Sequence, residues 1–478
     1  MIFTSFNFLI FFPLIALIYY TIPAKHRWVF LLISSYFFYI NIKPVYVVLL
    51  IFVTLSTYIF TIQIDKSKIE SIKKTLMRIN IVLILLPLFF FKYFSEVNLA
   101  IINTMEIFHL KWPLPEMKFL LPIGISFYTF MAIGYTVDVY NEEIKAEKNL
   151  GILALFISFF PLILSGPIER AKNMLPQFKL LKKPDYLDVV KGLKFMLWGY
   201  FMKLVVADRL GIYIDAIYNN ILQHNGTSLL FASCLYPFQI YADFGGYSLI
   251  AIGISKILGF NVMQNFNRPL FSTSISELWR RWHISLISWL TDYIYTPLSF
   301  AFRKYKKWGI VIAVFITFII SGIWHGAALT FVVWGLIQAI YLSIEVLTNK
   351  KKAAFVKKYN LNKKAWYIFL SIMITYSLFV TSQIVGRAYS MGDAFIIYER
   401  ILSMPGDLFI ASPSSLVYSL FGLAVLICKE FFEEFFPSRL LFFENKYKSV
   451  RLISYSFIII VILLIGVFDG GQFIYFQY

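Results

Sequence analysis

Two histidines lie in or beside apolar stretches, His283 in the segment 279–286 and His325 in the glycine-flanked segment 321–326. Ionisable residues inside a membrane are costly, so they indicate a functional site by default. Imidazole titrates near neutral pH without special tuning, and burial disfavours its cation. We therefore predict that His325 is a neutral general base, which removes the proton of a hydroxyl group as its oxygen attacks an acyl group.

Each histidine also has a purely structural interpretation. His325 would then be hydrogen-bonded inside a helix bundle, with Gly322 and Gly326 forming a Gly-x-x-x-Gly packing motif. His283 would belong to an interfacial aromatic belt with arginines whose long side chains reach toward water. The sequence leaves these interpretations open beside the catalytic one.

The segment before His283 has the composition of a cytoplasmic membrane interface. On one continuous helix, Trp279 and His283 would share a face, and Glu277 would pair with Arg281 four residues later. Three residues of this segment are of types that favour such a depth or a ligand channel: Trp279, Arg280 and Trp282.

The stretch 308–343 contains no Lys, Arg, Asp or Glu. As a single helix it would be about 54 Å long, whereas the hydrocarbon core of a bilayer is roughly 30 Å thick. Basic loops flank it, so we expect the chain to cross the membrane and return, with a break at the glycines around His325. Broken backbone at this depth must face protein or a water-filled cavity. We expect His325 nearer the outside and His283 nearer the cytosol, which fits a reaction conducted across the bilayer.

A second glycine pair follows Asp243 in the segment 243–248, and it suggests a broken helix that lines a cavity. Asp243 could instead pair with an arginine inside the bundle. The residues that we expect along a substrate channel are Trp279, Arg280, Trp282, Trp324 and Asp243. The sequence has no nucleophile elbow, phosphate-binding loop or zinc-protease motif, and we predict neither a metal site nor a bound cofactor.

The composition identifies the class of protein that must position these residues. Of 478 residues 59% are hydrophobic and only 15% charged, and the mean hydropathy is +0.72. A soluble enzyme, a disordered protein and a disulfide scaffold are thereby excluded. The apolar runs leave room for about 11–14 membrane helices, including re-entrant or broken ones. We predict an all-α, polytopic membrane protein.

The net charge of +18 comes from basic residues that gather in short loops, as in the cluster 350–364. This is the positive-inside pattern, so we infer a lipid bilayer and no nucleic acid as partner. Basic residues follow the first apolar run rather than precede it, which indicates an amino terminus outside. We find no repeat or long linker and expect one integral-membrane domain over 1–478. Its peripheral helices would occupy 1–118, its core with both histidines 119–348, and its last helices 349–478.

The order of several motifs resembles the membrane-bound O-acyltransferase family, in particular its branch that O-acetylates alginate and peptidoglycan. The matching segments are 121–128, 166–170, 243–248, 279–286, 321–326 and 473–478. The resemblance implies a many-helix fold around a central funnel, with His325 catalytic and His283 a second essential residue. It also implies a multi-pass protein of the bacterial cytoplasmic (inner) membrane, and an acyl group moved across that membrane from a cytosolic thioester.

Three functions remain as hypotheses. In the first, acetyl-CoA or another acyl thioester supplies the group for O-acetylation of an exported polysaccharide, alginate-like or peptidoglycan, with an exported SGNH-type acyl-transfer protein as partner. In the second, an acyl-carrier protein supplies D-alanine for teichoic acid. In the third, the protein is a transporter without chemistry, a class that tends to show inverted repeats, of which this sequence shows none.

Overall fold

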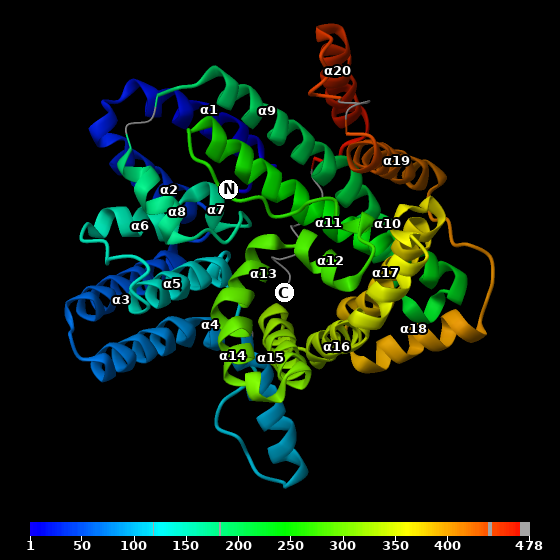
Figure 1. The fold of residues 1–478 in the computed structure, drawn as a ribbon, viewed down its shortest axis with the longest axis horizontal. Helices are drawn as coiled ribbons and strands as arrows, with labels where there is room; N and C mark the ends of the chain where they lie inside the picture. The colour runs from blue at the N-terminus through cyan, green and yellow to red at the C-terminus, as the bar shows by residue number, and fades with distance from the viewer. Residues whose placement is uncertain (118, 181–182, 438–441, 469–478) are drawn as a thin grey trace. The chain divides into compact units, whose positions relative to one another are not determined.

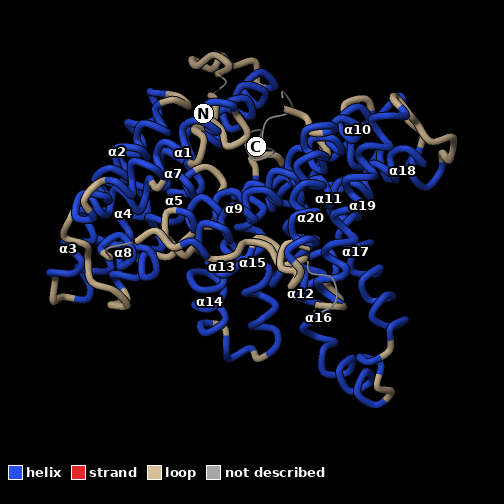
Figure 2. The backbone as a smooth tube through the Cα atoms, turned by 90° about the horizontal axis from the view of Figure 1, so that it is seen from above, coloured by secondary structure: helices blue, strands red, loops and turns tan. Residues whose placement is uncertain are grey.

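The computed structural model describes residues 1–117, 119–180, 183–437 and 442–468. Within these residues the chain forms helices and loops and no strand (Figure 2), which confirms the predicted all-α class. The described chain separates into two compact units. Unit 1 comprises Met1–Leu193 and Ala251–Met263, and unit 2 comprises Lys194–Ile250 and the described residues from Gln264 onward. The units interleave along the sequence, and the expected single domain stays a prediction.

Unit 1 is built from helices α1 to α8 and the first part of α9 (Figure 1). In this unit α3, α4 and α5 pack against one another, and α2 packs against α6. Buried phenylalanines hold α1, α2 and α7 together, since the ring of Phe38 lies 6.1 Å from Phe8 and 5.7 Å from Phe160. The bounds are α1 Phe6–Thr21, α2 Arg27–Ile40, α3 Val47–Lys66, α4 Glu70–Ile107, α5 Ile125–Tyr140, α6 Leu150–Ser158, α7 Phe160–Ile163, α8 Ala171–Lys179 and α9 Tyr186–Tyr200.

Unit 2 contains the segments with both histidines. Its core pairs are α15 with α16, α16 with α17, and α10 with α19, and the short α12 packs against α16 and α17. The bounds are η3 Phe201–Ala207, α10 Asp208–Tyr218, α11 Gly226–Ile257, η5 Pro269–Phe271, α12 Ile275–Arg281, α13 Ile284–Leu290, η6 Thr291–Tyr295, α14 Thr296–Ala301, α15 Lys307–His325, α16 Leu329–Lys358, α17 Ala365–Arg387, α18 Met391–Ser403, α19 Pro413–Phe435 and α20 Lys448–Ile465. The last residues of α11, from Ala251 on, belong to unit 1.

Seven of the described helices are long and apolar enough to cross a membrane, as a polytopic protein requires. They are α3 with the turn before it, α4, α15, α16, α17, α19 and α20. Other apolar runs of the sequence form shorter or irregular helices. The π-helical segments η3 and η6 interrupt the runs 190–206 and 284–302, so these runs do not count among the seven. This accounts for part of the difference from the expected 11–14 helices.

The predicted helix break at His325 is confirmed. Helix α15 ends at His325, Gly326 is extended (φ −168°, ψ 163°), and α16 begins at Leu329. The two helices then pack backbone to backbone, because a Cβ atom on Gly322 would lie 2.4 Å from the carbonyl oxygen of Phe331. Gly322 therefore has the packing role that the structural interpretation of this motif required.

Replacing Gly322 by Ala should lower the stability of the protein by about 1–3 kcal/mol, because α15 and α16 must move apart. Thermal unfolding of the detergent-solubilised protein measures this change. Gly392→Ala in α18 is the matched control, since the nearest atom that its Cβ would meet is Ser390 Oγ at 3.5 Å. Equal melting temperatures for the two variants would show that the close contact does not limit the packing.

Candidate functional site

Helix α12, which leads to His283, is fixed at its amino end by two polar side chains. Ser274 is the N-cap and accepts a hydrogen bond from the backbone N–H of Glu277 at 3.1 Å. The carboxylate of Glu345, on α16, accepts hydrogen bonds from the N–H groups of Ile275 (2.7 Å) and Ser276 (3.0 Å). The first N–H groups of a helix lack partners within it, so this carboxylate ties α12 to α16.

The carboxyl end of α12 is held by ion pairs. Arg281 pairs with Glu277 at 2.7 Å, which confirms the predicted pair, and with Glu434 of α19 at 2.9 Å. Burial raises the pKa of Glu277, but hydrogen bonds from Thr273 and Arg281 outweigh burial and leave the pKa below its usual value. Glu277 is therefore an anion at neutral pH, and Arg281 is neutralised on both sides.

The expectation that Trp279 and His283 share one helix face is wrong. Helix α12 ends at Arg281, Trp282 is extended, and His283 has φ 45° and ψ 50°, in the left-handed region. That region is uncommon for a residue other than glycine. The backbone turns here because the carbonyl group of Asn265 accepts the N–H of Ile284 at 2.8 Å, which begins α13 in a new direction.

Both histidines belong to one aromatic cluster of unit 2. The ring of His283, which is 1% exposed, lies 4.6 Å from Phe244 and 6.2 Å from Trp324. Trp324 lies 4.8 Å from the ring of its neighbour His325, which in turn lies 5.1 Å from Trp334. A single indole ring thus contacts both imidazoles. Their order across the membrane stays a prediction.

The environment of His283 favours neutral imidazole. Burial, and secondarily the nearby His325, lowers the pKa of His283 well below its usual value. His325 is half-buried at the end of α15. A neutral imidazole has one N–H donor and one acceptor nitrogen, so neutral His283 can accept a proton at one nitrogen and donate one from the other.

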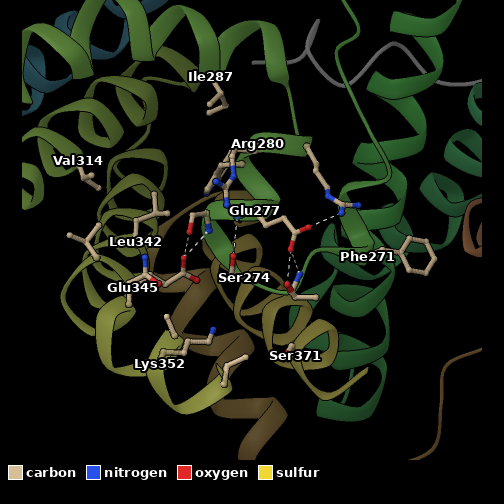
Figure 3. A pocket seen from close by; sticks show the side chains of 18 of the residues that line it. Phe271, Ser274, Glu277, Arg280, Ile287, Val314, Leu342, Glu345, Lys352 and Ser371 are labelled. Carbon is tan, nitrogen blue, oxygen red and sulfur yellow. Dashed lines mark hydrogen bonds and ion pairs between the residues drawn. The ribbon is translucent and has the colours of Figure 1, made fainter. Parts of the chain in front are cut away.

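A cavity of about 810 Å³ lies in unit 2 beside α12 (Figure 3). Of the five residues expected along a channel, Trp279 and Arg280 line it, whereas Trp282, Trp324 and Asp243 do not. Neither histidine lines it. One side of Trp279 faces the cavity, and its ring packs edge to face against Trp334 at 5.7 Å. Because Trp334 contacts His325, an aromatic layer stands between the cavity and the histidine cluster.

The cavity combines apolar walls with charges of both signs, since three carboxylates, Glu277, Glu345 and Glu434, line it together with Arg280, Arg281 and Lys352. Arg280 of α12 and Lys352 of α16 both line it, as Figure 3 shows. In the part of the chain that the structure describes, neither side chain has a carboxylate partner. Val314, Phe318 and Leu342 supply apolar surface. This arrangement suits a ligand with an apolar arm and an anionic end.

The structure places Asp243 away from the cavity. Helix α11 is continuous through Asp243, so the predicted helix break there is wrong. Its glycines serve close packing instead, since a Cβ on Gly246 would lie 2.8 Å from the carbonyl oxygen of Gly199. Lys203 Nζ lies 2.6 Å from Asp243 and 2.7 Å from Asp208, and all three side chains are buried. Asp243 thus pairs with a lysine, a residue type that the sequence interpretation did not consider.

The sequence-based predictions did not include three residues whose side chains organise this region: Asn265, Glu345 and Lys203. A signal existed for Lys203, which is a charged residue inside the apolar run 190–206. Asn265 and Glu345 lie in polar or basic surroundings, where their residue types are ordinary. The segment 473–478, which contributed to the family resemblance, lies outside the described residues.

Comparison with known proteins gives a consistent result. The model of the membrane-bound O-acyltransferase family matches residues 143–391, a range that contains both histidines. The chain is 34% identical over 413 residues to the probable alginate O-acetylase of Pseudomonas aeruginosa, a match that covers 84% of this chain and 75% of that protein. It is 29% identical over 396 residues to the peptidoglycan O-acetyltransferase of Helicobacter pylori (74% and 73% covered). It is 31% identical over 267 residues to the teichoic acid D-alanyltransferase of Bacillus subtilis (53% and 65% covered).

Proposed function

This chain belongs to the membrane-bound O-acyltransferase family, and from that premise we propose that it transfers acetyl groups from a cytosolic thioester, acetyl-CoA, for O-acetylation of an exported polysaccharide. It is an O-acyltransferase of a membrane-spanning fold. We further propose that it lies in a bacterial cytoplasmic membrane with its amino terminus outside, and that an exported SGNH-type protein completes delivery to the polymer.

The observation that carries this proposal is a pair of imidazoles in one aromatic cluster, which an aromatic layer separates from a cavity lined by Arg280 and Lys352. In the reaction, the attacking hydroxyl oxygen forms a bond to the thioester carbonyl carbon while His325 takes the hydroxyl proton. The carbon–sulfur bond then breaks, and the leaving thiolate recovers that proton. The net products are the acetyl ester and free CoA thiol. The family to which this chain belongs consists of acyl-transfer enzymes, so membership in it does not support the transporter hypothesis.

We propose that the cavity holds the thioester donor. Arg280 and Lys352 would contact the phosphates of CoA, and the apolar wall would contact its pantetheine arm. The acyl end would then face Trp279, and transfer to a hydroxyl group at His325 would require the rings of Trp279 and Trp334 to move apart.

Replacing Arg280 by Glu should raise the KM for acetyl-CoA by about 10-fold or more and leave kcat nearly unchanged, because a charge-assisted contact to phosphate is lost. Initial rates in proteoliposomes at varied acetyl-CoA measure both constants. Arg303→Glu is the matched control, since Arg303 is exposed and does not line the cavity. A KM that is unchanged by the substitution at position 280 would place the donor elsewhere.

D-alanyl transfer from a carrier protein is the second candidate, because a teichoic acid D-alanyltransferase matches about half of this chain. The acetyltransferase relatives match a larger share of it. Proteoliposomes offered radiolabelled acetyl-CoA or a radiolabelled D-alanyl carrier protein separate the two reactions. We expect acceptor-dependent release of CoA with acetyl-CoA and no transfer from the carrier; transfer from the carrier alone would replace our proposal with the second one.

A further inference from the structure

Asn265 connects two sequence motifs through its side chain. It lies in the loop between α11 and η5 and is fully buried. Its Oδ1 accepts hydrogen bonds from the N–H of Ser285 (3.2 Å) and from Ser285 Oγ (2.9 Å), and it lies 3.0 Å from Nδ1 of His283. Its Nδ2 donates to Ser248 Oγ at 3.0 Å. One amide group therefore joins the segment after Asp243 to the segment that contains His283.

These contacts determine which nitrogen of His283 carries hydrogen. A backbone N–H can only donate, so the atom of Asn265 that faces the N–H of Ser285 must be the amide oxygen. The same oxygen faces Nδ1 of His283, and an oxygen without hydrogen can only accept. Nδ1 must therefore donate its hydrogen, and in a neutral ring the lone pair is then on Nε2.

We infer that Asn265 is a positioning residue that holds His283 in the tautomer with hydrogen on Nδ1, so that Nε2 carries the lone pair and can relay the proton that His325 takes in acyl transfer. The proton-accepting role rests on the proposed function, whereas the tautomer does not. Asn265 acts on the backbone as well, because its carbonyl group accepts the N–H of Ile284 beside the left-handed His283. Side chain and main chain of one residue thus fix both the orientation and the hydrogen of this imidazole.

The charged surroundings of His283 are simple. From α11 it faces the ring of Phe244, and from the loop it faces Phe266 and Asn265, none of which titrates. From α15 it faces Trp324, with His325 as the titratable neighbour. A charge introduced at position 265 therefore acts on His283 at contact distance, without a competing carboxylate among these neighbours.

The first test is direct observation of the tautomer. Nitrogen-15 magnetic resonance of histidine-labelled full-length protein in lipid bilayers at pH 7.5 distinguishes an N–H nitrogen from a nitrogen with a lone pair. The His283→Gln spectrum identifies the signals of His283 among the five histidines. We expect an N–H signal for Nδ1 and a lone-pair signal for Nε2. The opposite pattern would overturn the inference, and it would do so even if acetyl transfer itself were demonstrated.

The second test is the pH dependence of acetyl transfer in Asn265→Asp. The aspartate keeps an oxygen toward Nδ1 but adds a negative charge, which favours imidazolium. Neutral His283 is then present only at higher pH, so the acid limb of the pH profile of kcat should move up by about 1–3 pH units. Asn267→Asp is the matched control, because Asn267 is exposed in the same loop. Superimposable profiles for the two variants would refute the positioning role.

The third measurement separates positioning from simple folding. Asn265→Ala removes both the acceptor for Nδ1 and the donor for Ser248, so kcat should fall about 100-fold at every pH, with the KM for acetyl-CoA unchanged. Recovery of activity at high pH should occur in Asn265→Asp but not in Asn265→Ala. If neither variant folds, the tautomer observed in the unaltered protein still decides the inference. Transfer of D-alanine instead of acetyl groups would contradict the proposed function but would leave the inference about the tautomer unaffected.

Discussion

Replacing His325 by Ala should lower the rate of acetyl transfer by about 10²- to 10⁴-fold, because the general base of the proposed reaction is removed. The side chain is half-buried at the very end of α15, where its ring packs on Trp324 and Trp334. The substitution truncates a side chain at the end of a helix rather than in its middle. Initial rates in proteoliposomes, normalised to the amount of folded protein in the membrane, measure the change.

A structural role for His325 predicts a different outcome. In that case His325→Ala would lower the melting temperature, and His325→Gln, which retains hydrogen-bonding groups, would restore activity together with stability. In a catalytic role both variants are inactive and both melt near the unaltered protein. His26→Ala is the control, because His26 is exposed in the turn before α2 and should keep full activity.

Replacing Lys203 by Met should destabilise the protein by about 3–5 kcal/mol, the largest effect on folding that we expect from a single substitution. The side chain is 2% exposed and touches the carboxylates of Asp208 and Asp243, which are themselves almost fully buried. Without the cation, two buried anions lose their ion pair and repel each other. A strong fall in the melting temperature and in the yield of folded protein should follow.

The comparison for this variant is Lys194→Met, in the same helical run. Lys194 pairs with Glu444, whose side chain is 63% exposed, and surface pairs contribute little to stability. The combined variant Lys203→Met, Asp208→Asn and Asp243→Asn removes all three charges and should recover much of the lost stability. A Lys203→Met protein as stable as Lys194→Met would mean that the buried carboxylates do not depend on this lysine.

The helix break at His325 could be predicted because every signal for it is local. The length without charge, the flanking basic loops and the glycines are all visible within one stretch of sequence. The same holds for the pair between Glu277 and Arg281, which needs only the helical repeat. The packing of Gly322 against Phe331 follows from the hairpin that this break creates.

The path of the chain at His283 could not be predicted in this way. It depends on Asn265, which is 18 residues away and whose partners become neighbours only in the folded protein. The glycines after Asp243 were ambiguous for a related reason. Glycine is suitable both for a helix break and for close packing of two helices, and only the neighbouring helix with Gly199 decides between the two.

The interleaving of the two units has a consequence for biosynthesis. The segment Ala251–Met263 follows the first part of unit 2, Lys194–Ile250, in the chain. It nevertheless belongs to unit 1, where the backbone N–H of Asn261 donates to Gln177 Oε1 at 2.8 Å. Glu169 likewise accepts the N–H of Met263. A ribosome must therefore translate through residue 263 before these contacts can form. Until then the helices of unit 1 lack the contacts that residues 251–263 supply, and unit 1 is incomplete.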